Sequence, residues 1–546
     1  MNKINGMHWK NALISAANNI KNKKDAINAL NVFPVPDGDT GSNMASTIIA
    51  ARDAILNLNE KNLEAVGKVV SQSMLMNARG NSGVILSQIF KGFANAFKNK
   101  TEISVFDMVN AFEEASKAAY RAVLKPVEGT ILTVIREIAE GLKETVVVES
   151  TFEDIFNLAL EYARKSCDNT PNLLAILKEV GVTDSGGEGL YAIIEGMSLF
   201  FQNKAVIETK TSSESIGTFI SDSEVFNGEF GYCTEFILEL KNYRKFDKES
   251  LVKRLEKIGN SMVVVQDEEI LKVHIHAKKP GDVLNAVNSL GQFLKIKIDN
   301  MTVQASSSKE VASKLASPDA TTPKKTYSKK CALISCNVGQ GIIELVKQNG
   351  VSYVIEGGQT NNPSTQDIVK AADAVDSKTV FILTNNSNII LSAQQASTIV
   401  TDKKIITIPT KSQAQCLSVA MNFNEDASEE ENLETMKEAM KNVKYGEIAP
   451  SVKNTKLNGI KIKEGDFMVM ANNEITATAK TSMDAAINLL HTLVDEDSQI
   501  VTIFYGQDVS ESDSKILQNY IEVNFDVEIE IYSGGQSIYP YFIAVE

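Results

Sequence analysis

Apolar residues recur at three-to-four-residue spacing over most of the first 200 positions. The pattern is clear at residues 9–20, 84–89 and 131–142. This spacing places apolar side chains on one face of a helix, whereas runs of alternating β-branched residues, which favour strands, are scarce. We therefore predict an all-helical N-terminal domain over residues 1–205, with Trp9 packed inside it.

The pattern changes after a polar segment at 208–215 that is rich in Ser and Thr and is typical of a linker. The region that follows alternates strand-like and helix-like patterns, which predicts a small α+β domain at 217–304. Period-two alternation predicts strands at 232–240 and 270–276, and helical spacing predicts helices at 251–258 and 282–289.

Residues 305–330 are rich in Ser, Lys, Thr and Pro, which predicts a second linker. Short apolar strands and helices then alternate, so we predict an α/β C-terminal domain at 331–546 whose first strands form a parallel sheet. We interpret the acidic segment 425–431 as a solvated loop. A Gly-Gly-Gln sequence occurs at 357–359 and again at 534–536, as two ligand-binding turns or as two tight loops. The predicted strands are 331–335, 353–355, 380–383 and 404–408, and the predicted helices are 342–348, 366–375, 389–399 and 414–423.

The amino-acid composition argues against several classes of function. The 546 residues carry a net charge of −14, and no basic patch with interleaved aromatic residues occurs, so we expect no nucleic-acid partner. The five cysteines are odd in number and scattered, and residues 1–10 do not resemble a signal peptide, which favours a reduced, cytoplasmic setting. No apolar run reaches the roughly 18 residues that a membrane span needs, so we expect no transmembrane segment.

The segment 31–44 contains the strongest candidate chemistry. Asp37 and Asp39 lie two residues apart, after two prolines that restrict φ. Gly38 and Gly41 allow the backbone to turn tightly and to approach a ligand. Asn31 lies six residues before Asp37 and can supply a third oxygen. Carboxylate oxygens beside a helix N-terminus suit a Mg²⁺ ion that carries phosphates.

Ser42 and Asn43 are candidate caps of the helix that follows this segment. Three further junctions rich in Gly, Ser and Thr interrupt the same helical region, at 77–83, 125–130 and 182–189. One helix N-terminus contributes only about 0.3–1 kcal/mol to anion binding. Tight nucleotide binding would therefore require several of these junctions to converge.

These motifs resemble the L domain of dihydroxyacetone kinases. The resemblance implies an all-helical barrel that binds ATP through magnesium ions held at three acidic positions. Asp37 and Asp39 match two of these positions, and Asn31 lies nearest to the third. The implied nucleotide contacts fall on Thr40, Gly41, Ser42, Asn43, Ser82, Gly83, Thr130, Asp184, Ser185 and Gly186.

Nearly the whole chain resembles the ATP-binding subunit of bacterial fatty acid kinase, because this helical region is followed by a module containing Cys233, His274 and His276 and by a module with Gly-Gly-Gln turns. The resemblance implies that ATP phosphorylates a fatty acid carboxylate, presented by a separate carrier protein, to an acyl phosphate. It also implies that the C-terminal domain resembles the carrier and helps to recruit it. The same resemblance implies a homodimer formed through the middle module.

The middle module contains a candidate zinc site. His274 and His276 are two residues apart on a predicted strand, so their side chains share a face. Cys233 on a neighbouring strand would complete a Cys-His-His set suitable for Zn²⁺. The residues alone leave open that these are ordinary core or surface histidines, whereas the family resemblance favours zinc.

Acyl phosphate formation from a carboxylate requires charge screening rather than a general base. Arg79 and Lys125 lie beside the nucleotide-loop motifs and are candidate charge stabilisers, with surface ion pairs as the alternative. Two other functions stay open: a dihydroxyacetone-type sugar kinase and a non-catalytic nucleotide-sensing scaffold. The sugar kinase binds its substrate through a histidine, and the C-terminal region offers only His491, within a predicted helix.

Overall fold

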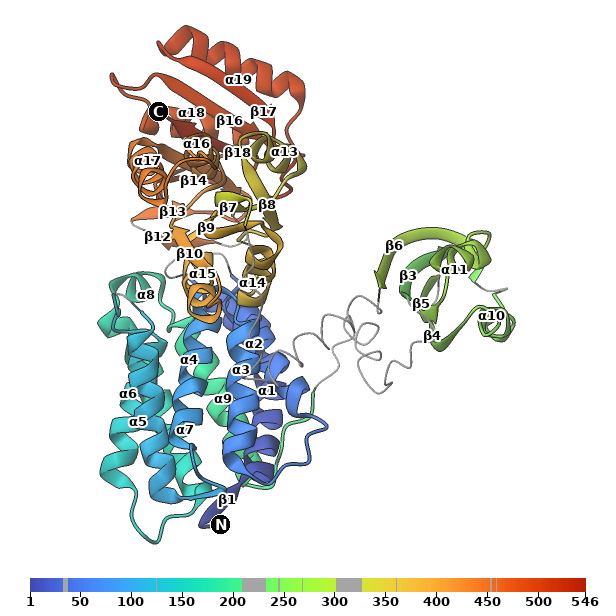
Figure 1. The fold of residues 1–546 in the computed structure, drawn as a ribbon, viewed down its shortest axis with the longest axis vertical. Coiled ribbons are helices and arrows are strands. Elements are labelled where there is room, and N and C mark those ends of the chain that lie inside the picture. Colours follow the sequence, from blue (N-terminus) through green and yellow to red (C-terminus); the bar gives the residue numbers. More distant parts are fainter. Residues whose placement is uncertain are drawn as a thin grey trace. The chain divides into compact units, whose positions relative to one another are not determined.

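The computed structural model of this chain describes residues 1–32, 38–123, 125–208, 232–243, 246–267, 269–300, 327–359, 361–451, 454–457 and 459–546. It divides into two compact units (Figure 1). One unit joins Met1–Glu208 to Thr326–Glu546, and the other is Thr209–Lys325. The protein is multidomain, with a helix-rich N-terminal region and an α/β C-terminal region.

The N-terminal region is helical, as predicted. Each long helix packs on the next along the chain, and α9 packs on both α7 and α1, so the order of contacts forms a closed ring. The helices are α1 (Gly6–Leu30), α2 (Thr40–Ile55), α3 (Leu63–Asn77), α4 (Gly80–Ala96), α5 (Val105–Arg121), α6 (Ile131–Thr145), α7 (Phe152–Leu173), α8 (Ala175–Val180) and α9 (Ser185–Phe201).

An aromatic cluster fills the core of this region, and Trp9 lies within it as predicted. Its ring meets that of Phe97 edge-on at 5.0 Å and lies 5.4 Å from that of Phe93. Large aromatic rings contribute much of the apolar area that a helical core buries. The sequence analysis missed a small antiparallel sheet between β1 (Lys3–Asn5) and β2 (Glu102–Ser104), because three residues are too few to show an alternating pattern.

The second unit contains an antiparallel four-stranded sheet in the order β4-β5-β3-β6. The predicted strands at 232–240 and 270–276 are confirmed as β3 and β5, and both predicted helices are present. The elements are β3 (Tyr232–Leu240), α10 (Lys248–Leu255), β4 (Gly259–Asp267), β5 (Ile270–Ala277), α11 (Pro280–Val287) and β6 (Gly291–Asn300).

The first half of the C-terminal region is a parallel sheet in the order β10-β9-β7-β8, as predicted. Helices connect its strands, which is the usual way to join parallel neighbours. The elements are β7 (Lys329–Asn337), α13 (Gln340–Gln348), β8 (Val351–Glu356), α14 (Thr365–Ala374), β9 (Ser377–Leu383), α15 (Ser387–Ile399), β10 (Lys404–Ile408), α16 (Gln413–Met421) and α17 (Glu429–Asn442).

The second half contains a six-stranded sheet in the order β15-β14-β11-β18-β16-β17, in which only β16 and β17 pair in parallel. The predicted parallel sheet therefore covers only half of the C-terminal domain. The elements are β11 (Lys444–Pro450), β12 (Thr455–Leu457), β13 (Ile460–Ile462), β14 (Phe467–Ala471), β15 (Glu474–Ala479), α18 (Ser482–Leu493), β16 (Ile500–Tyr505), α19 (Glu511–Asn524), β17 (Glu528–Ser533) and β18 (Tyr541–Val545).

The prediction of a solvated loop at 425–431 is wrong for its second half. Ser428 is the N-cap of α17, and its backbone N–H donates to the side chain of Glu431 in a reciprocal capping box. Three glutamates in the first helical turn also interact favourably with the positive end of the helix dipole. The acidic residues of this segment therefore form the first turn of a helix.

The two Gly-Gly-Gln turns follow β8 and β17 and border one small cavity of about 70 Å³. Gln359 accepts a hydrogen bond from the Tyr539 hydroxyl, and Gln536 donates to the carbonyl oxygens of Phe504 and Tyr539. Helix α13 also packs closely against the end of β17. Gly341 allows this approach, because a Cβ atom there would lie 1.8 Å from the Ser533 carbonyl oxygen. These turns join the two halves of the domain.

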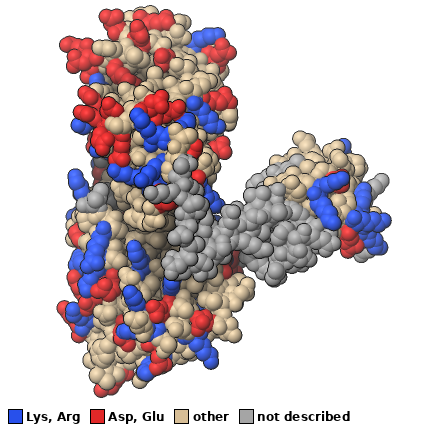
Figure 2. Space-filling model, viewed as in Figure 1, with Lys and Arg blue, Asp and Glu red and all other residues tan. Residues whose placement is uncertain are grey.

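Among the described helices, none combines the length and the apolar character that a membrane crossing requires. Figure 2 shows acidic and basic side chains interspersed over the visible face of the molecule.

Candidate active site

The N-termini of α2, α4, α6 and α9 converge on one cavity of about 720 Å³. Helix N-termini carry unpaired backbone N–H groups and a partial positive charge, so this arrangement suits an anion such as a polyphosphate. The helical region contributes to its lining Asn31, Asp39, Thr40, Asn43, Asn81, Ser82, Lys125, Thr130, Asp184, Ser185 and Gly186, among others.

Asp39 is the N-cap residue of α2, yet its carboxylate makes no capping bond to the helix. Instead Oδ2 accepts a hydrogen bond of 2.6 Å from the Asn362 side chain. Gly38 has φ +65°, as the tight turn predicted from the sequence requires. Asn31 lines the same cavity and is 3% exposed. Asp37 lies outside the described residues, so its predicted pairing with Asp39 stays a prediction.

The prediction that Ser42 and Asn43 cap α2 is wrong, because the helix begins at Thr40 and both residues lie inside its first turn. The Ser42 backbone N–H donates to Asn28 Oδ1 at 3.1 Å, and Asn28 Nδ2 donates to the Ser42 hydroxyl at 2.9 Å. Glycine is required beside them, since a Cβ at Gly41 would lie 2.2 Å from the Lys24 carbonyl oxygen. These contacts hold α2 tightly against α1.

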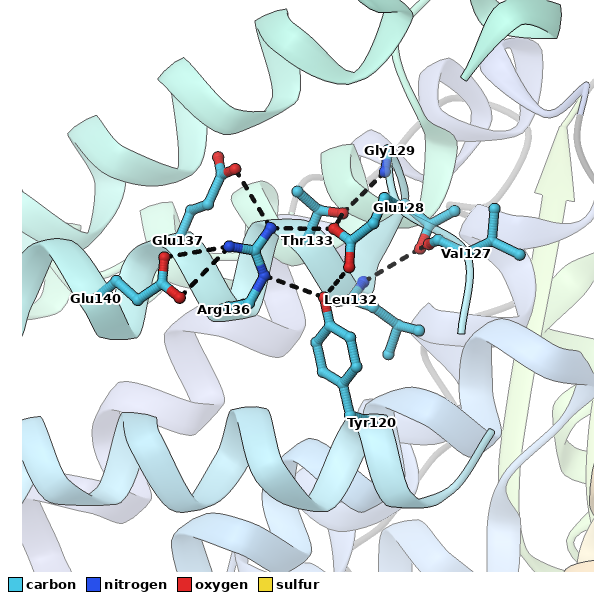
Figure 3. Close-up of polar contacts among 10 residues, drawn as sticks. Tyr120, Val127, Glu128, Gly129, Leu132, Thr133, Arg136, Glu137 and Glu140 are labelled. Atoms are coloured by element: carbon cyan, nitrogen blue, oxygen red, sulfur yellow. Dashed lines mark hydrogen bonds and ion pairs between the residues drawn. The ribbon is translucent and has the colours of Figure 1, made fainter. Parts of the chain in front are cut away.

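The loop before α6 is held by a polar network around Glu128 (Figure 3). The carboxylate accepts hydrogen bonds from the Tyr120 hydroxyl at 2.8 Å, the Thr133 hydroxyl at 2.7 Å and the Arg136 guanidinium at 3.0 Å. Burial opposes ionisation, but these three donors outweigh it and lower the pKa of Glu128. Thr130, the N-cap of α6, donates to the Val127 carbonyl at 2.7 Å. The network rigidifies this wall of the cavity.

Asp184 caps α9 by accepting a hydrogen bond of 2.7 Å from the Gly187 backbone N–H. It is 5% exposed, and this burial raises the pKa of its carboxyl to about 7. The neighbouring Ser185 donates to the Thr40 hydroxyl at 3.2 Å, which links the starts of α9 and α2. The structure thus brings these predicted nucleotide-contact residues together, and the Asp184 carboxylate also stabilises the helix end.

The two candidate charge stabilisers occupy different surroundings. Lys125 lines the main cavity. Arg79 lines an adjacent pocket of about 680 Å³ together with Asp39. Its guanidinium donates to the Asn362 carbonyl oxygen at 2.7 Å and lies 3.8 Å from a carboxylate oxygen of Asp367. Arg79 is therefore held by the C-terminal domain in this structure.

The C-terminal domain supplies the rest of the cavity wall, which sequence reasoning missed. Asn81 donates to Asn388 Oδ1 at 3.0 Å, across 307 residues of sequence. No local pattern signals such a contact. The lining residues from this domain are Ser387, Asn388, Ile390, Leu391, Gln394, Pro409 and Lys411.

The predicted zinc ligands lie in the other unit. The backbone register of β3 and β5 pairs Cys233 with His276 and Glu235 with His274. The side chains of Cys233, His274 and His276 lie outside what the structure describes. Within the part of the chain that is described, no cluster of three or more His, Cys, Asp or Glu residues forms a metal site.

Three family models match most of this chain. The FakA-like C-terminal domain family of fatty acid kinase matches residues 332–546, and the FakA-like middle domain family matches 229–308. A DAK2 domain matches 34–199. This chain belongs to the FakA-like fatty acid kinase family. An uncharacterized protein from Staphylococcus epidermidis (strain ATCC 12228) is 40% identical, and one from Staphylococcus aureus (strain USA300) is 39% identical, each with 100% of both chains covered.

Solved structures show weaker likeness. The native dihydroxyacetone kinase of C. freundii has a TM-score of 0.31 at 11% identity, over 44% of this chain and 55% of that one. The same enzyme in complex with AMP-PNP and Mg²⁺ has a TM-score of 0.29 at 12% identity, over 40% and 48%. A hypothetical protein from Thermotoga maritima, described as revealing fatty acid binding function, has a TM-score of 0.31 at 17% identity, over 40% and 100%. These scores are too low to assign a ligand to this family member.

Proposed function

We propose that this chain binds ATP with Mg²⁺ and phosphorylates the carboxylate of a fatty acid that a separate carrier protein presents. The γ-phosphoryl group passes to a carboxylate oxygen, which yields an acyl phosphate and ADP. One observation carries the proposal: the starts of α2, α4, α6 and α9 meet at one cavity beside Asp39, within the DAK2-matched region of a FakA-like chain.

Electrostatics is the main barrier to this reaction. A fatty acid carboxyl group has a pKa near that of Glu, about 4.3, and is already ionised at neutral pH. Bringing one unit negative charge to about 4 Å from another costs about 4 kcal/mol at an effective dielectric constant of 20. Cations and oriented N–H groups at the cavity therefore matter more than a general base.

The roles follow from position. Asp37 and Asp39, with Asn31 as a third oxygen, are proposed to hold Mg²⁺ against the phosphates. The predicted contacts in the helix starts position the nucleotide, and these include Ser82 and Gly83 of α4 and Gly186 of α9. Lys125 lines the cavity and Arg79 lines the adjacent pocket, and both are proposed to neutralise charge during transfer. The helical ring is proposed to be the barrel that the family resemblance implies.

The test is phosphoryl transfer from ATP and Mg²⁺ to a fatty acid on purified carrier protein. The variant Asp39→Ala should lower turnover by about a hundredfold or more, because it removes a carboxylate that positions the metal. Asp25→Ala is the control, since Asp25 is an exposed aspartate on α1 that lines neither of the two pockets. Full activity of Asp39→Ala with an unchanged melting temperature would remove the magnesium assignment.

The same assay separates the alternative functions. Turnover of dihydroxyacetone without carrier would establish the sugar kinase instead, and nucleotide binding without any turnover would establish a scaffold. The site argues against the sugar kinase, because His491 lies in α18 with its ring nitrogen 2.9 Å from the Tyr520 hydroxyl and does not line the cavity.

We also propose that Cys233, His274 and His276 bind Zn²⁺ in the middle domain. The backbone pairing of Cys233 with His276 supports this, since directly opposed residues bring their Cβ atoms to about 5 Å. Elemental analysis should find zinc in the native protein and less in Cys233→Ala, with Cys331→Ala as the buried-cysteine control. Undiminished zinc in Cys233→Ala would exclude that ligand.

The remaining proposals concern organisation. The domain limits are proposed as 1–205, 217–304 and 331–546, with a linker at 305–330. A homodimer through the middle domain, recruitment of the carrier by the C-terminal domain and a cytoplasmic location are proposed on the family resemblance. Sedimentation analysis of the full chain tests the dimer, which a monomeric mass would exclude.

A further inference from the structure

The loops that follow the parallel strands of the C-terminal domain reach the candidate active site. After β8, Asn362 donates a hydrogen bond of 2.6 Å to Asp39. After β9, Asn388 in the first turn of α15 lines the main cavity, and after β10 Lys411 lines it as well. Ligands of open α/β sheets bind outside the carboxyl ends of the strands, where such loops gather. The cavity therefore lies between the helix starts of the N-terminal region and a sheet edge that is itself suited to a ligand.

The loop that carries Lys411 is held in place by hydrogen bonds. The Thr384 hydroxyl donates to the Thr410 carbonyl oxygen at 2.8 Å, and the Thr410 hydroxyl donates to the Thr384 carbonyl oxygen at 2.5 Å. Both threonines are fully buried. The Lys411 backbone N–H donates to the side-chain oxygen of Gln415 at 2.8 Å. These bonds fix the point from which the Lys411 side chain extends, and none of them uses its ammonium group.

The Lys411 ammonium group is available for a ligand. Among the residues that the structure describes, no carboxylate forms an ion pair with it, and the residue is exposed where it lines the cavity. Two nearby lysines differ in this respect. Lys404 pairs with Glu429, and Lys403 is 6% exposed and donates to backbone carbonyl oxygens. Lys403 and Lys404 thus support the fold, whereas Lys411 adds positive charge to the cavity.

The cavity needs positive charge if an anion is to bind there. Asp39 and Asp184 place carboxyl groups on its wall, and Lys125 and Lys411 place ammonium groups on it. Ammonium groups bind phosphate oxygens strongly, because the donor and the acceptor both carry charge. The N-terminal region and the C-terminal domain therefore each contribute a lysine to the same cavity.

We propose that Lys411 binds the phosphates of the nucleotide, so that the C-terminal domain completes the active site of the helical region. The inference rests on the proposed function and adds a catalytic residue to it. The ammonium group donates hydrogen bonds to phosphate oxygens, and its charge offsets the repulsion between the γ-phosphate and the approaching carboxylate. During transfer the bond between the γ-phosphorus and its bridging oxygen breaks, the bond to the carboxylate oxygen forms, and ADP leaves. Lys411 keeps its protons throughout.

Nucleotide binding to the full chain tests this assignment without the carrier. In calorimetric titrations with ATP and Mg²⁺, Lys411→Ala should raise the dissociation constant about tenfold or more, because a charge-assisted hydrogen bond is lost. Lys411→Arg keeps the charge and should recover most of the affinity. Lys378→Ala is the matched control and should leave the constant unchanged. Lys378 is an exposed lysine at the amino end of β9, at the opposite edge of the same sheet.

Salt dependence distinguishes a phosphate contact from a structural role. The difference in affinity between the wild-type chain and Lys411→Ala should shrink as the salt concentration rises, because added ions screen the charge. The two proteins should have equal melting temperatures without nucleotide, since the hydrogen bonds of this loop do not use the Lys411 side chain.

Two results would overturn the assignment. One is an equal dissociation constant for the wild-type chain and Lys411→Ala. The other is an equal loss of affinity in Lys411→Ala and Lys411→Arg that salt does not change, which would reveal a structural effect. Absence of nucleotide binding to the wild-type chain would instead refute the proposed function, on which this assignment depends.

Discussion

At the scale of single residues, buried polar side chains line the cavity. Asp184 and Ser185 line the cavity, are 5% and 3% exposed, and are hydrogen-bonded to Gly187 and Thr40 of the same domain. Asp39 differs, since its carboxylate leaves the helix end free and reaches Asn362. Asp39 therefore connects the cavity wall of the helical region to the C-terminal domain.

Asp184 predicts a pH dependence of stability. Its pKa is raised from 3.8 to about 7, so the folded protein retains a proton that the unfolded chain loses above pH 4. The free energy of unfolding is therefore highest, with respect to this group, below pH 4. It falls by on the order of 4 kcal/mol as the pH rises from 4 to 7, because only the unfolded chain has released the proton. Asp184→Asn, which keeps an oxygen for the cap, should flatten that decline in denaturant titrations of the helical region. Equal slopes in both proteins would contradict the assignment.

At the scale of helices and strands, close packing between helices sets the positions of the loops that border the cavity. The α1–α2 contact depends on Gly41, where a Cβ would lie 2.2 Å from the Lys24 carbonyl oxygen. At the start of α4, Gly80 adopts φ +58°, which favours glycine, and a Cβ at Gly83 would lie 2.5 Å from the Thr47 hydroxyl of α2. These glycines lie in the loop motifs that the sequence analysis assigned to nucleotide binding. Close packing and backbone conformation explain these glycines independently of any ligand.

Gly41→Ala should be strongly destabilising for this reason. Its Cβ would lie 2.2 Å from a backbone oxygen of α1, which cannot move without displacing that helix. We expect a loss of about 1–3 kcal/mol in the free energy of unfolding, as for other overpacked sites. Ser46→Ala on the exposed side of α2 is the control and should change stability by less than about 0.5 kcal/mol. Equal stability of the two variants would show that α1 yields easily.

At the scale of the whole molecule, two segments that are far apart in the sequence come together to form the cavity. Arg79 and Asn362 are 283 residues apart, yet their contact places the C-terminal domain against the kinase-related region. Residues of both regions therefore line the same cavity, and a ligand that enters it contacts each of them.

Hydrogen exchange of the full chain should report whether a nucleotide enters this cavity. Addition of ATP with Mg²⁺ should decrease exchange of amides at the start of α4 and in α15, because both line the cavity, whereas α18 in the second half of the C-terminal domain should stay unchanged. The readout is peptide-level mass spectrometry at equal protein concentration. Unchanged exchange at both segments would mean that the nucleotide does not bind in this cavity.

Local patterns in the chain were enough to predict the helical first region, strands β3 and β5, the parallel half of the C-terminal domain and the loops with candidate chemistry. Each depends on neighbours a few residues apart, where periodicity, Gly and capping residues act directly. The chain order did not reveal that Arg79 is held by Asn362, that α15 walls the cavity, or that the last sheet is mostly antiparallel. Those features arise from side chains hundreds of residues apart, whose pairing depends on how folded surfaces fit and leaves no periodic trace.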